Sequence, residues 1–239
     1  MKNPLRKRIL RELRDELGKY LVIFLLLTAT IGFVSGFLVA DGSLLAAYKE
    51  GFNLYNIEDG YFDLAKKANK AQVKTMQGWG VQLYENFYVE KSLTNGSTLR
   101  VFAPREQVDL VCLMSGSLPR TADEVAIDRM YADNNGLTPG DTLETEDGRR
   151  WTISGLVALS DYSCLFSDNN DSMFDSVKFG VGIVSKDCFD ALGTDQLTYH
   201  YAWKYDEPPV DKAAQQDRAE ELMKQMTAEV KLESFVPQY

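Results

Sequence analysis

The chain has 239 residues, 45% of them hydrophobic, and a formal net charge of −9. This length suffices for one or two domains with a buried core. The negative charge would repel nucleic-acid phosphates, which argues against a nucleic-acid partner, and three cysteines without a C-x-x-C pair argue against a zinc site.

Residues 1–19 predict a basic amphipathic helix on the cytoplasmic side. Asn3 can cap this helix and Pro4 suits its first turn. Its apolar positions recur every fourth residue, at Leu5, Ile9, Leu13 and Leu17. Seven basic and three acidic residues give the segment a net charge of +4, which leaves −13 for the rest of the chain. Such a helix can lie against anionic lipid or pack on a cytoplasmic partner.

Residues 20–40 predict one transmembrane helix, because they include no charged side chain. At about 1.5 Å per residue the segment reaches about 31 Å, close to the hydrocarbon thickness of a bilayer. The basic flank is expected to stay in the cytoplasm, which places residues after about 41 outside. A cleaved signal peptide ending at Ala40-Asp41-Gly42 is the alternative, but the apolar run is longer than such peptides usually have.

Within this segment, small side chains recur at every fourth position. Because apolar helices gain little from hydrophobicity in lipid, a small-residue face favours packing against other membrane helices. Glycine and threonine are also common in membrane helices generally. The predicted helix-packing face consists of Thr28, Gly32, Gly36 and Ala40.

Residues 41–56 predict a helical stalk. Its apolar positions follow a 3-4-3 spacing typical of a coiled-coil seam, although Gly51 weakens the helix. The predicted stalk seam consists of Leu45, Tyr48, Phe52 and Tyr55.

Residues 57–239 predict an extracytoplasmic α+β core domain, either one domain or two small lobes. Apolar alternation and turn signals place strands near 60–65, 81–90, 98–104, 107–113, 142–146, 150–158, 179–185 and 198–204. Helices are expected around 66–77, 128–135, 185–192 and 211–229.

Several local signals support these elements. Asp147-Gly148 predicts a hairpin turn between residues 141 and 159, and Asp128 and Gly136 can begin and end a short helix. The last helix is expected to dock on a sheet through one apolar face, formed by Ala219, Leu222, Met223, Met226 and Val230.

Catalytic and metal-binding signals are weak. The chain has no phosphate-loop sequence, and its one histidine, His200, is expected to be a packed or surface residue rather than a catalytic one. The acidic loop 168–175 lacks the glycine and the glutamate of a calcium loop. Asp123 and Glu124 are expected in a solvated turn, and Gly180 and Gly182 in a closely packed strand. We therefore expect no enzyme activity, cofactor or metal.

In an oxidising compartment, one disulfide could form and leave one thiol free. Three pairings are possible among Cys112, Cys164 and Cys188, and the sequence does not choose among them. Free buried thiols are an equal alternative.

The order of several segments resembles the extracytoplasmic core domain of FtsX-like (MacB-type) ABC transporter permeases. The segments are 57–64 (IEDGYFDL), Leu118-Pro119, 123–128 (DEVAID), 136–143 (GLTPGDTL) and 153–157 (ISGLV). The resemblance implies a domain between a first membrane helix and later membrane helices, with a separate ATPase subunit in the cytoplasm. On this reading the sequence is an N-terminal fragment of a permease or a truncated product ending at Tyr239.

Two functions follow as hypotheses. The first is a permease segment that couples substrate or partner binding outside to membrane helices and to the ATPase. Its expected partners are membrane lipid, the ATPase, and the remaining permease helices or a second permease copy. The second is a single-span anchored enzyme or sensor. The sequence does not identify a transported substrate.

Overall fold

The computed structural model describes residues 14, 16–168, 171, 173–193 and 196–238, and for residues 41–49 only the helical backbone. The described residues fall into two units, which divide between Phe52 and Asn53. Most of the amphipathic helix predicted over residues 1–19 lies outside the described residues.

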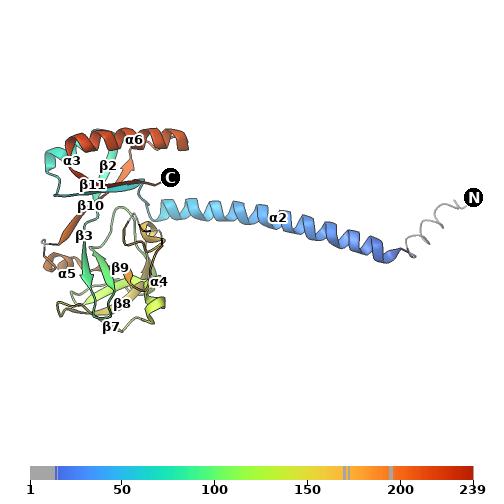
Figure 1. Cartoon of the computed structure of the whole chain (residues 1–239), viewed down its shortest axis with the longest axis horizontal. Helices are drawn as coiled ribbons and strands as arrows, with labels where there is room; N and C mark the ends of the chain where they lie inside the picture. The colour runs from blue at the N-terminus through green and yellow to red at the C-terminus, as the bar shows by residue number, and fades with distance from the viewer. Residues whose placement is uncertain (1–13, 15, 169–170, 172, 194–195, 239) are drawn as a thin grey trace, which may run out of the picture. The chain divides into compact units, whose positions relative to one another are not determined.

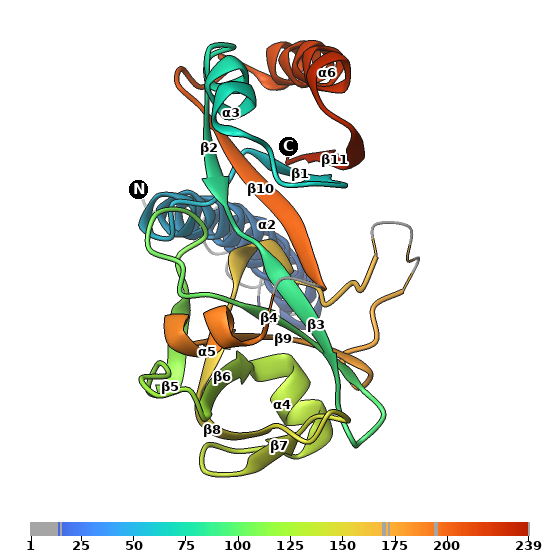
Figure 2. The ribbon, with the colours of Figure 1, turned by 90° about the vertical axis from the view of Figure 1, so that its left-hand side faces the viewer.

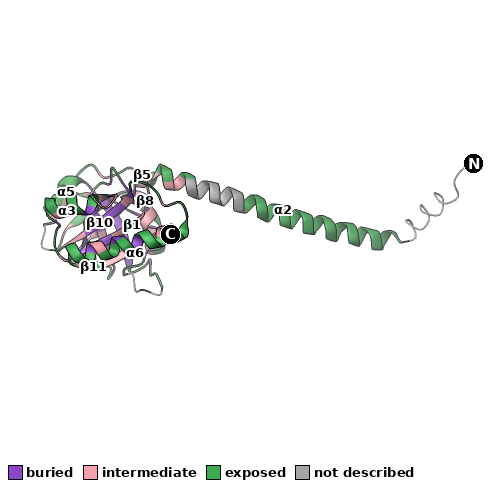
Figure 3. Cartoon of the chain, turned by 90° about the horizontal axis from the view of Figure 1, so that it is seen from above, coloured by how far each residue is buried: buried purple, intermediate pink, exposed green. Residues whose placement is uncertain are grey.

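A single helix, α2 (Leu17–Leu54), runs through the predicted membrane segment and most of the predicted stalk (Figure 1). Its part Leu17–Ala40 is long and apolar enough to cross a membrane. Every side chain described in that part is exposed (Figure 3). Exposed leucine, isoleucine and phenylalanine side chains on all faces of a helix are typical of a helix surrounded by lipid.

The second unit is built on a mixed sheet. Its described strands are β1 (Gly60–Leu64), β2 (Val81–Glu85), β3 (Tyr88–Ser92), β4 (Thr98–Phe102), β5 (Cys112–Gly116), β6 (Glu124–Asp128), β7 (Thr142–Glu144), β8 (Arg150–Ala158), β9 (Phe179–Val184), β10 (Leu197–Tyr205) and β11 (Leu232–Pro237). The order is β11-β1-β10-β3-β4-β9-β6-β8-β5, with β2 also paired to β10 and β7 to β8. The pairs β4–β9 and β6–β8 are parallel and the others antiparallel. An apolar helix followed by a mixed α+β domain confirms the predicted fold class.

Two hydrophobic cores divide this unit into two lobes, joined through β10 (Figure 2). In the first lobe, α3 (Lys70–Gln77) and α6 (Lys212–Glu229) cover the sheet of β1, β2, β10 and β11. Phe62 stacks on Tyr201 and Trp203 there, with Leu222 and Met226 of α6 in the same core.

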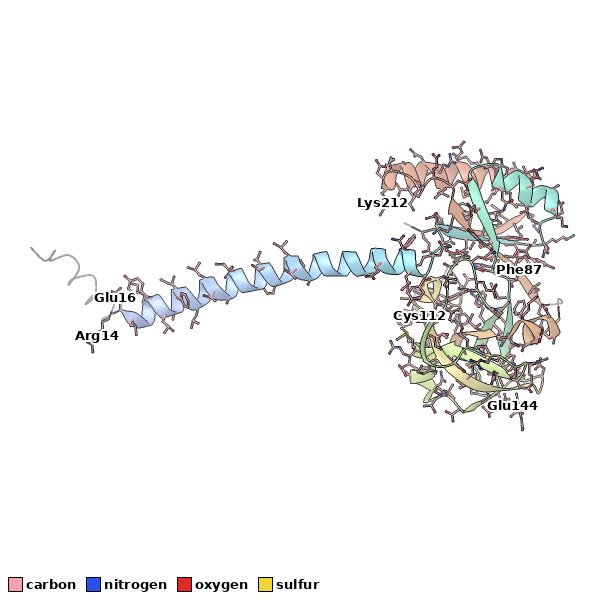
Figure 4. All side chains as sticks on the ribbon, turned by 180° about the vertical axis from the view of Figure 1, so that it is seen from behind. Arg14, Glu16, Phe87, Cys112, Glu144 and Lys212 are labelled. Carbon is pink, nitrogen blue, oxygen red and sulfur yellow. The ribbon has the colours of Figure 1, made fainter. Side chains whose placement is uncertain are left out.

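The second lobe contains β3 to β9 with α4 (Arg129–Asn135) and α5 (Lys186–Ala191). Trp151, Tyr131 and Ile153 are fully buried in its core. β9 is buried at all six positions, because sheet neighbours flank it and side chains cover both its faces. Figure 4 labels Lys212 on the first lobe and Glu144 on the second, with Phe87 between them.

Three local predictions are confirmed. The Asp128 carboxylate accepts bonds from the amides of Met130 and Tyr131 at 2.7 and 3.1 Å and caps α4, and Gly136 ends this helix at φ 64°. β7 and β8 form the predicted hairpin, with Gly148 at φ 85° in its turn. The first and last helices predicted for this domain are also present, although α3 begins four residues later than expected.

Several strand predictions were wrong. The segment 81–90 is two strands, because Asn86 turns inward. Its backbone N–H donates to the His200 carbonyl at 3.0 Å. The strand predicted at 107–113 begins only at Cys112, since Asp109 has φ 48° and interrupts the extended backbone. The sequence reading missed β6 and β11.

Two side-chain predictions also need correction. Met223 is 40% exposed, so it does not belong to the buried face of α6, and Val230 lies just past the helix, partly buried. Glu124 is the first residue of β6, and only Asp123 lies in the expected turn.

Candidate functional site

The predicted helix-packing face lies open on α2. Thr28, Gly32, Gly36 and Ala40 are exposed, and a methyl group added at either glycine would meet no atom within 4 Å. The face therefore leaves room for another helix to approach closely, and its role in packing stays a prediction.

The predicted stalk seam is only partly described. Leu45 and Tyr48 have helical backbone, and their side chains lie outside the described set. Phe52 is half-buried within α2, whereas Tyr55 lies in the turn after the helix. The seam stays a prediction.

The chain is anchored to a loop immediately after α2. The Tyr55 carbonyl accepts the Leu110 amide at 2.8 Å, and the Asn56 carbonyl accepts the Asp109 amide at 3.2 Å. The Tyr55 hydroxyl also bonds the Cys112 Sγ at 3.0 Å. We call residues 55–59 with the loop 105–112 the junction.

Buried carboxylates lie in the junction. Glu58 and Asp109 are fully buried, and Asp109 Oδ1 accepts the Glu58 amide at 3.0 Å. Nearby, Arg105 donates to Asp161 at 2.7 Å, with both side chains at most 4% exposed. Burial, followed by the charges of Asp109 and Asp161, raises the pKa of Glu58 well above its ordinary value. Burial and the charge of Asp161 raise the pKa of Asp109 to about 6.

The last described strand returns the chain to the junction. β11 lies antiparallel to β1, and the Gln238 amide donates to the Asp59 carbonyl at 2.9 Å. The Gln238 side chain donates to the Glu58 carboxylate at 3.0 Å. The first and last described residues of this domain are thus held side by side.

Three polar residues form one row across β10, β1 and β11. Asp63 lies opposite both His200 and Ser234 in the sheet register. His200 Nδ1 is 2.7 Å from Asp63 Oδ1, and the Ser234 hydroxyl donates to Asp63 Oδ2 at 2.5 Å. Burial favours the protonated Asp63, but the bonds from His200 and Ser234 outweigh it and lower the pKa of this carboxyl.

This row differs from a hydrolase triad. In a triad the histidine lies between the acid and the serine and takes the serine proton. Here the carboxylate lies in the middle, so His200 and Ser234 both bind Asp63, and the row does not activate Ser234 as a nucleophile. Of the packed and surface positions expected for His200, the structure shows the packed one, since the residue is 4% exposed and its ring lies 4.7 Å from that of Tyr61.

The row lines a cavity of about 390 Å³ between the two lobes. β1, β10 and β11 form one side, and β3, β4 and the short helix η1 (Ser160–Tyr162) with the loop after it form the other. The sequence reading missed this site, because its residues come from separate segments that meet only in the folded sheet.

Arg100 is held in one wall of the cavity. It donates to Glu90 at 2.6 and 3.0 Å, to the Tyr162 hydroxyl at 2.9 Å and to the Ser167 carbonyl at 2.8 Å. Its guanidinium also lies 4.3 Å from the ring centre of Tyr88. These contacts use most of its donors, so Arg100 is a structural residue of the wall.

The other candidate residues form no such site. All three cysteines are free thiols: Cys164 is exposed, Cys112 half-buried and Cys188 buried. In the acidic loop, Asp171 accepts the amides of Ser167 and Asp168. Across the part of the chain that the structure describes, no group of three or more His, Cys, Asp or Glu residues could hold a metal ion.

No family model and no curated protein matches the chain. Among solved structures, it is similar to the periplasmic region of MacB from Actinobacillus actinomycetemcomitans, at 12% identity and a TM-score of 0.38, over 72% of this chain and 85% of that one. It is also similar to the extracellular domain of the noncanonic ABC-type transporter YknZ from Gram-positive bacteria, at 10% identity and a TM-score of 0.38, over 73% and 98% of the two chains. A permease-protein domain from Porphyromonas gingivalis has 17% identity and a TM-score of 0.30, over 66% and 70%. At these values the likenesses do not assign the chain to a family.

Proposed function

We propose that the chain is the N-terminal part of an ABC transporter permease. In this proposal α2 crosses the membrane with its basic end in the cytoplasm, and the domain after it lies outside. That domain couples the binding of a substrate or partner to the membrane helices, and through them to a separate ATPase. The proposal agrees with the order of sequence segments that resembles FtsX-like permeases.

The return of β11 to the junction is the observation that carries this proposal. A domain inserted between two membrane helices has to return the chain to the membrane, and the shortest connection has the entering and leaving segments side by side. The bond between the Gln238 amide and the Asp59 carbonyl holds the segment after β11 beside the segment after α2 in this way. A domain carried on one anchor has no such requirement.

The junction also supports a coupling role. α2 continues as one helix to Leu54, and within the next few residues backbone bonds tie the chain to the loop that contains Asp109. Lys204 of β10 donates to the Ile57 carbonyl at 2.7 Å, which ties the same segment to the strand shared by both lobes. A change in the arrangement of the lobes would therefore act on the residues that follow the membrane helix.

Affinity purification from the native membrane tests the proposal. The tagged protein, expressed from its own locus and extracted in mild detergent, is expected to bring with it an ATPase that has a phosphate-loop sequence. Mass spectrometry identifies the partner, and ATP hydrolysis by the purified complex confirms its activity. A protein recovered without any ATPase, in an amount that matches its abundance in the membrane, would support a single-span enzyme or sensor and overturn the proposal.

A further inference from the structure

The cavity between the lobes has a negative electrostatic character. Its lining includes the carboxylates of Asp63, Asp161, Asp168 and Glu233. The charge of Asp161 is offset by Arg105, at 2.7 Å. Of the other carboxylates, Asp63 is bonded to His200 and Ser234, and Glu233 is exposed at the rim.

The one arginine of the lining does not reverse this character. Arg100 is paired with Glu90 at 2.6 Å, and its remaining contacts go to Tyr162 and to a carbonyl. An anion entering the cavity would have to displace these partners. The exposed carboxylates of Glu233 and Asp168 would also repel an anion.

Aromatic rings make up much of the remaining wall. Tyr61, Tyr88, Tyr162 and Phe166 line the cavity, and the Arg100 guanidinium already lies 4.3 Å from the ring centre of Tyr88. Aromatic faces attract organic cations, and the attraction grows when the cation leaves water. Aromatic rings together with carboxylates form the usual environment for ammonium and guanidinium groups. The cavity volume of about 390 Å³ accommodates a small molecule or one long side chain.

We propose that this cavity binds a small organic cation with an ammonium or guanidinium group. The aromatic side chains contact its apolar body, Glu233 attracts its charge at the rim, and the Asp63–His200 pair forms the polar base. The inference deepens the proposed function by naming the class of ligand for the outer domain. It depends on that function only for the ligand's role, since binding is measured on the chain alone.

Protection of Cys164 from alkylation tests the proposal. This thiol is exposed and lines the cavity, whereas Cys112 lies in the junction and serves as an internal reference. The full chain in detergent is treated with iodoacetamide, with and without agmatine, which has both a guanidinium and an ammonium group. Agmatine at millimolar concentration is expected to slow the alkylation of Cys164 and to leave that of Cys112 unchanged. Sodium acetate at the same ionic strength is expected to protect neither thiol.

A pair of matched variants separates the effect of a cavity carboxylate on agmatine binding from the effect of the chain's overall negative charge. Glu233→Gln removes a rim carboxylate, and Glu207→Gln removes an exposed carboxylate outside the cavity lining. Glu233→Gln is expected to raise the agmatine concentration for half protection about two- to fivefold, as for an exposed ion pair. Glu207→Gln is expected to leave it unchanged.

Three results would overturn the proposal. They are a lack of protection by agmatine, equal protection by acetate, and an equal effect of the two variants. Because the assay contains no ATPase, failure here leaves the proposed permease role to its own test. Protection of Cys164 without recovery of an ATPase would in turn support the site and reject the permease.

Discussion

At the scale of single residues, the row of His200, Asp63 and Ser234 joins three strands through one carboxylate. Asp63 accepts hydrogen bonds from both neighbours. Because its side chain is only 16% exposed, water replaces these bonds poorly when they are lost. The row therefore stabilises the edge of the first lobe as well as lining the cavity.

Asp63→Asn is expected to reduce the free energy of unfolding at pH 7 by about 1–3 kcal/mol, because hydrogen bonds to a charged group are lost. The pKa of Asp63 is lowered in the folded state. Its stabilising contribution is thus present above the unfolded pKa of about 3.9 and is lost as the pH falls below it. The difference between Asp63→Asn and the native protein should shrink below about pH 4. This difference in the free energy of unfolding is measured by urea unfolding, with tryptophan fluorescence as the signal.

Asp206→Asn is the control for this prediction, since Asp206 is exposed. An equal loss of stability in both variants would contradict a specific role for the row.

The buried carboxylates of the junction predict the opposite pH dependence. The pKa of Glu58 is raised by burial and by neighbouring acids, so the unfolded chain releases this proton at a lower pH than the folded chain. Stability therefore falls as the pH rises above the unfolded pKa of about 4.3. Glu58→Gln cannot ionise, and its stability relative to the native protein should increase between pH 5 and pH 8.

Unfolding midpoints in urea at the two pH values check this expectation. Glu146→Gln, at an exposed position, is expected to show no such trend. A Glu58→Gln variant whose stability relative to the native protein falls between pH 5 and pH 8 would mean that the ionised Glu58 is stabilised in the fold.

At the scale of elements, the glycines of β9 show how closely other side chains pack against this strand. A methyl group at Gly180 would lie 2.5 Å from the Tyr131 ring of α4. That ring is fixed, since its hydroxyl is 2.6 Å from the Ser97 hydroxyl. At Gly182 the nearest atom, of Val125, would be 3.1 Å away.

Gly180→Ala is therefore expected to destabilise the protein by about 1–3 kcal/mol, the usual cost of overpacking a core. Gly182→Ala should cost less, because its neighbour needs to move only a few tenths of an ångström. Thermal unfolding of the two variants compares them directly. If Gly182→Ala were the more destabilising, close packing of α4 on the strand would not be the reason for the glycine at 180.

The predicted helix-packing face of α2 is likewise a property of one element. Leucine at Gly32 and Gly36 favours the helix itself, so the fold of the outer domain should not change. The double variant is expected to reduce severalfold the recovery of partner helices and ATPase, because it blocks close approach.

Thr30→Leu places a leucine on the opposite face of the helix and is the control. Equal losses in the two variants would reject the predicted face. Recovery is measured by quantitative mass spectrometry of the purified complex.

At the scale of the whole molecule, the charge pattern predicts the orientation in the membrane. The basic flank should remain in the cytoplasm and the domain of net negative charge should lie outside. An impermeant maleimide added to intact cells is then expected to label Cys164, which is exposed, and labelling should be lost in Cys164→Ser. Labelling only after the cells are opened would place the domain inside.

Much of the fold could be predicted from local patterns. The apolar run of residues 20–40, the cap at Asp128 and the turn at Gly148 depend on neighbours in sequence, and each is present as expected or within a few residues. The strands β6 and β11 were missed, since β6 is paired on both sides by distant segments and β11 forms an edge whose pattern is short and mixed.

The sequence alone determined that one apolar helix precedes an acidic α+β domain, because hydrophobicity, charge and turn residues act over a few positions. Only the tertiary structure decided where the polar residues meet. Asp63, His200 and Ser234 are far apart in the chain, and antiparallel pairing across three strands places them in one row. The same pairing brings Gln238 to Asp59, so long-range sheet register determines both the cavity and the junction.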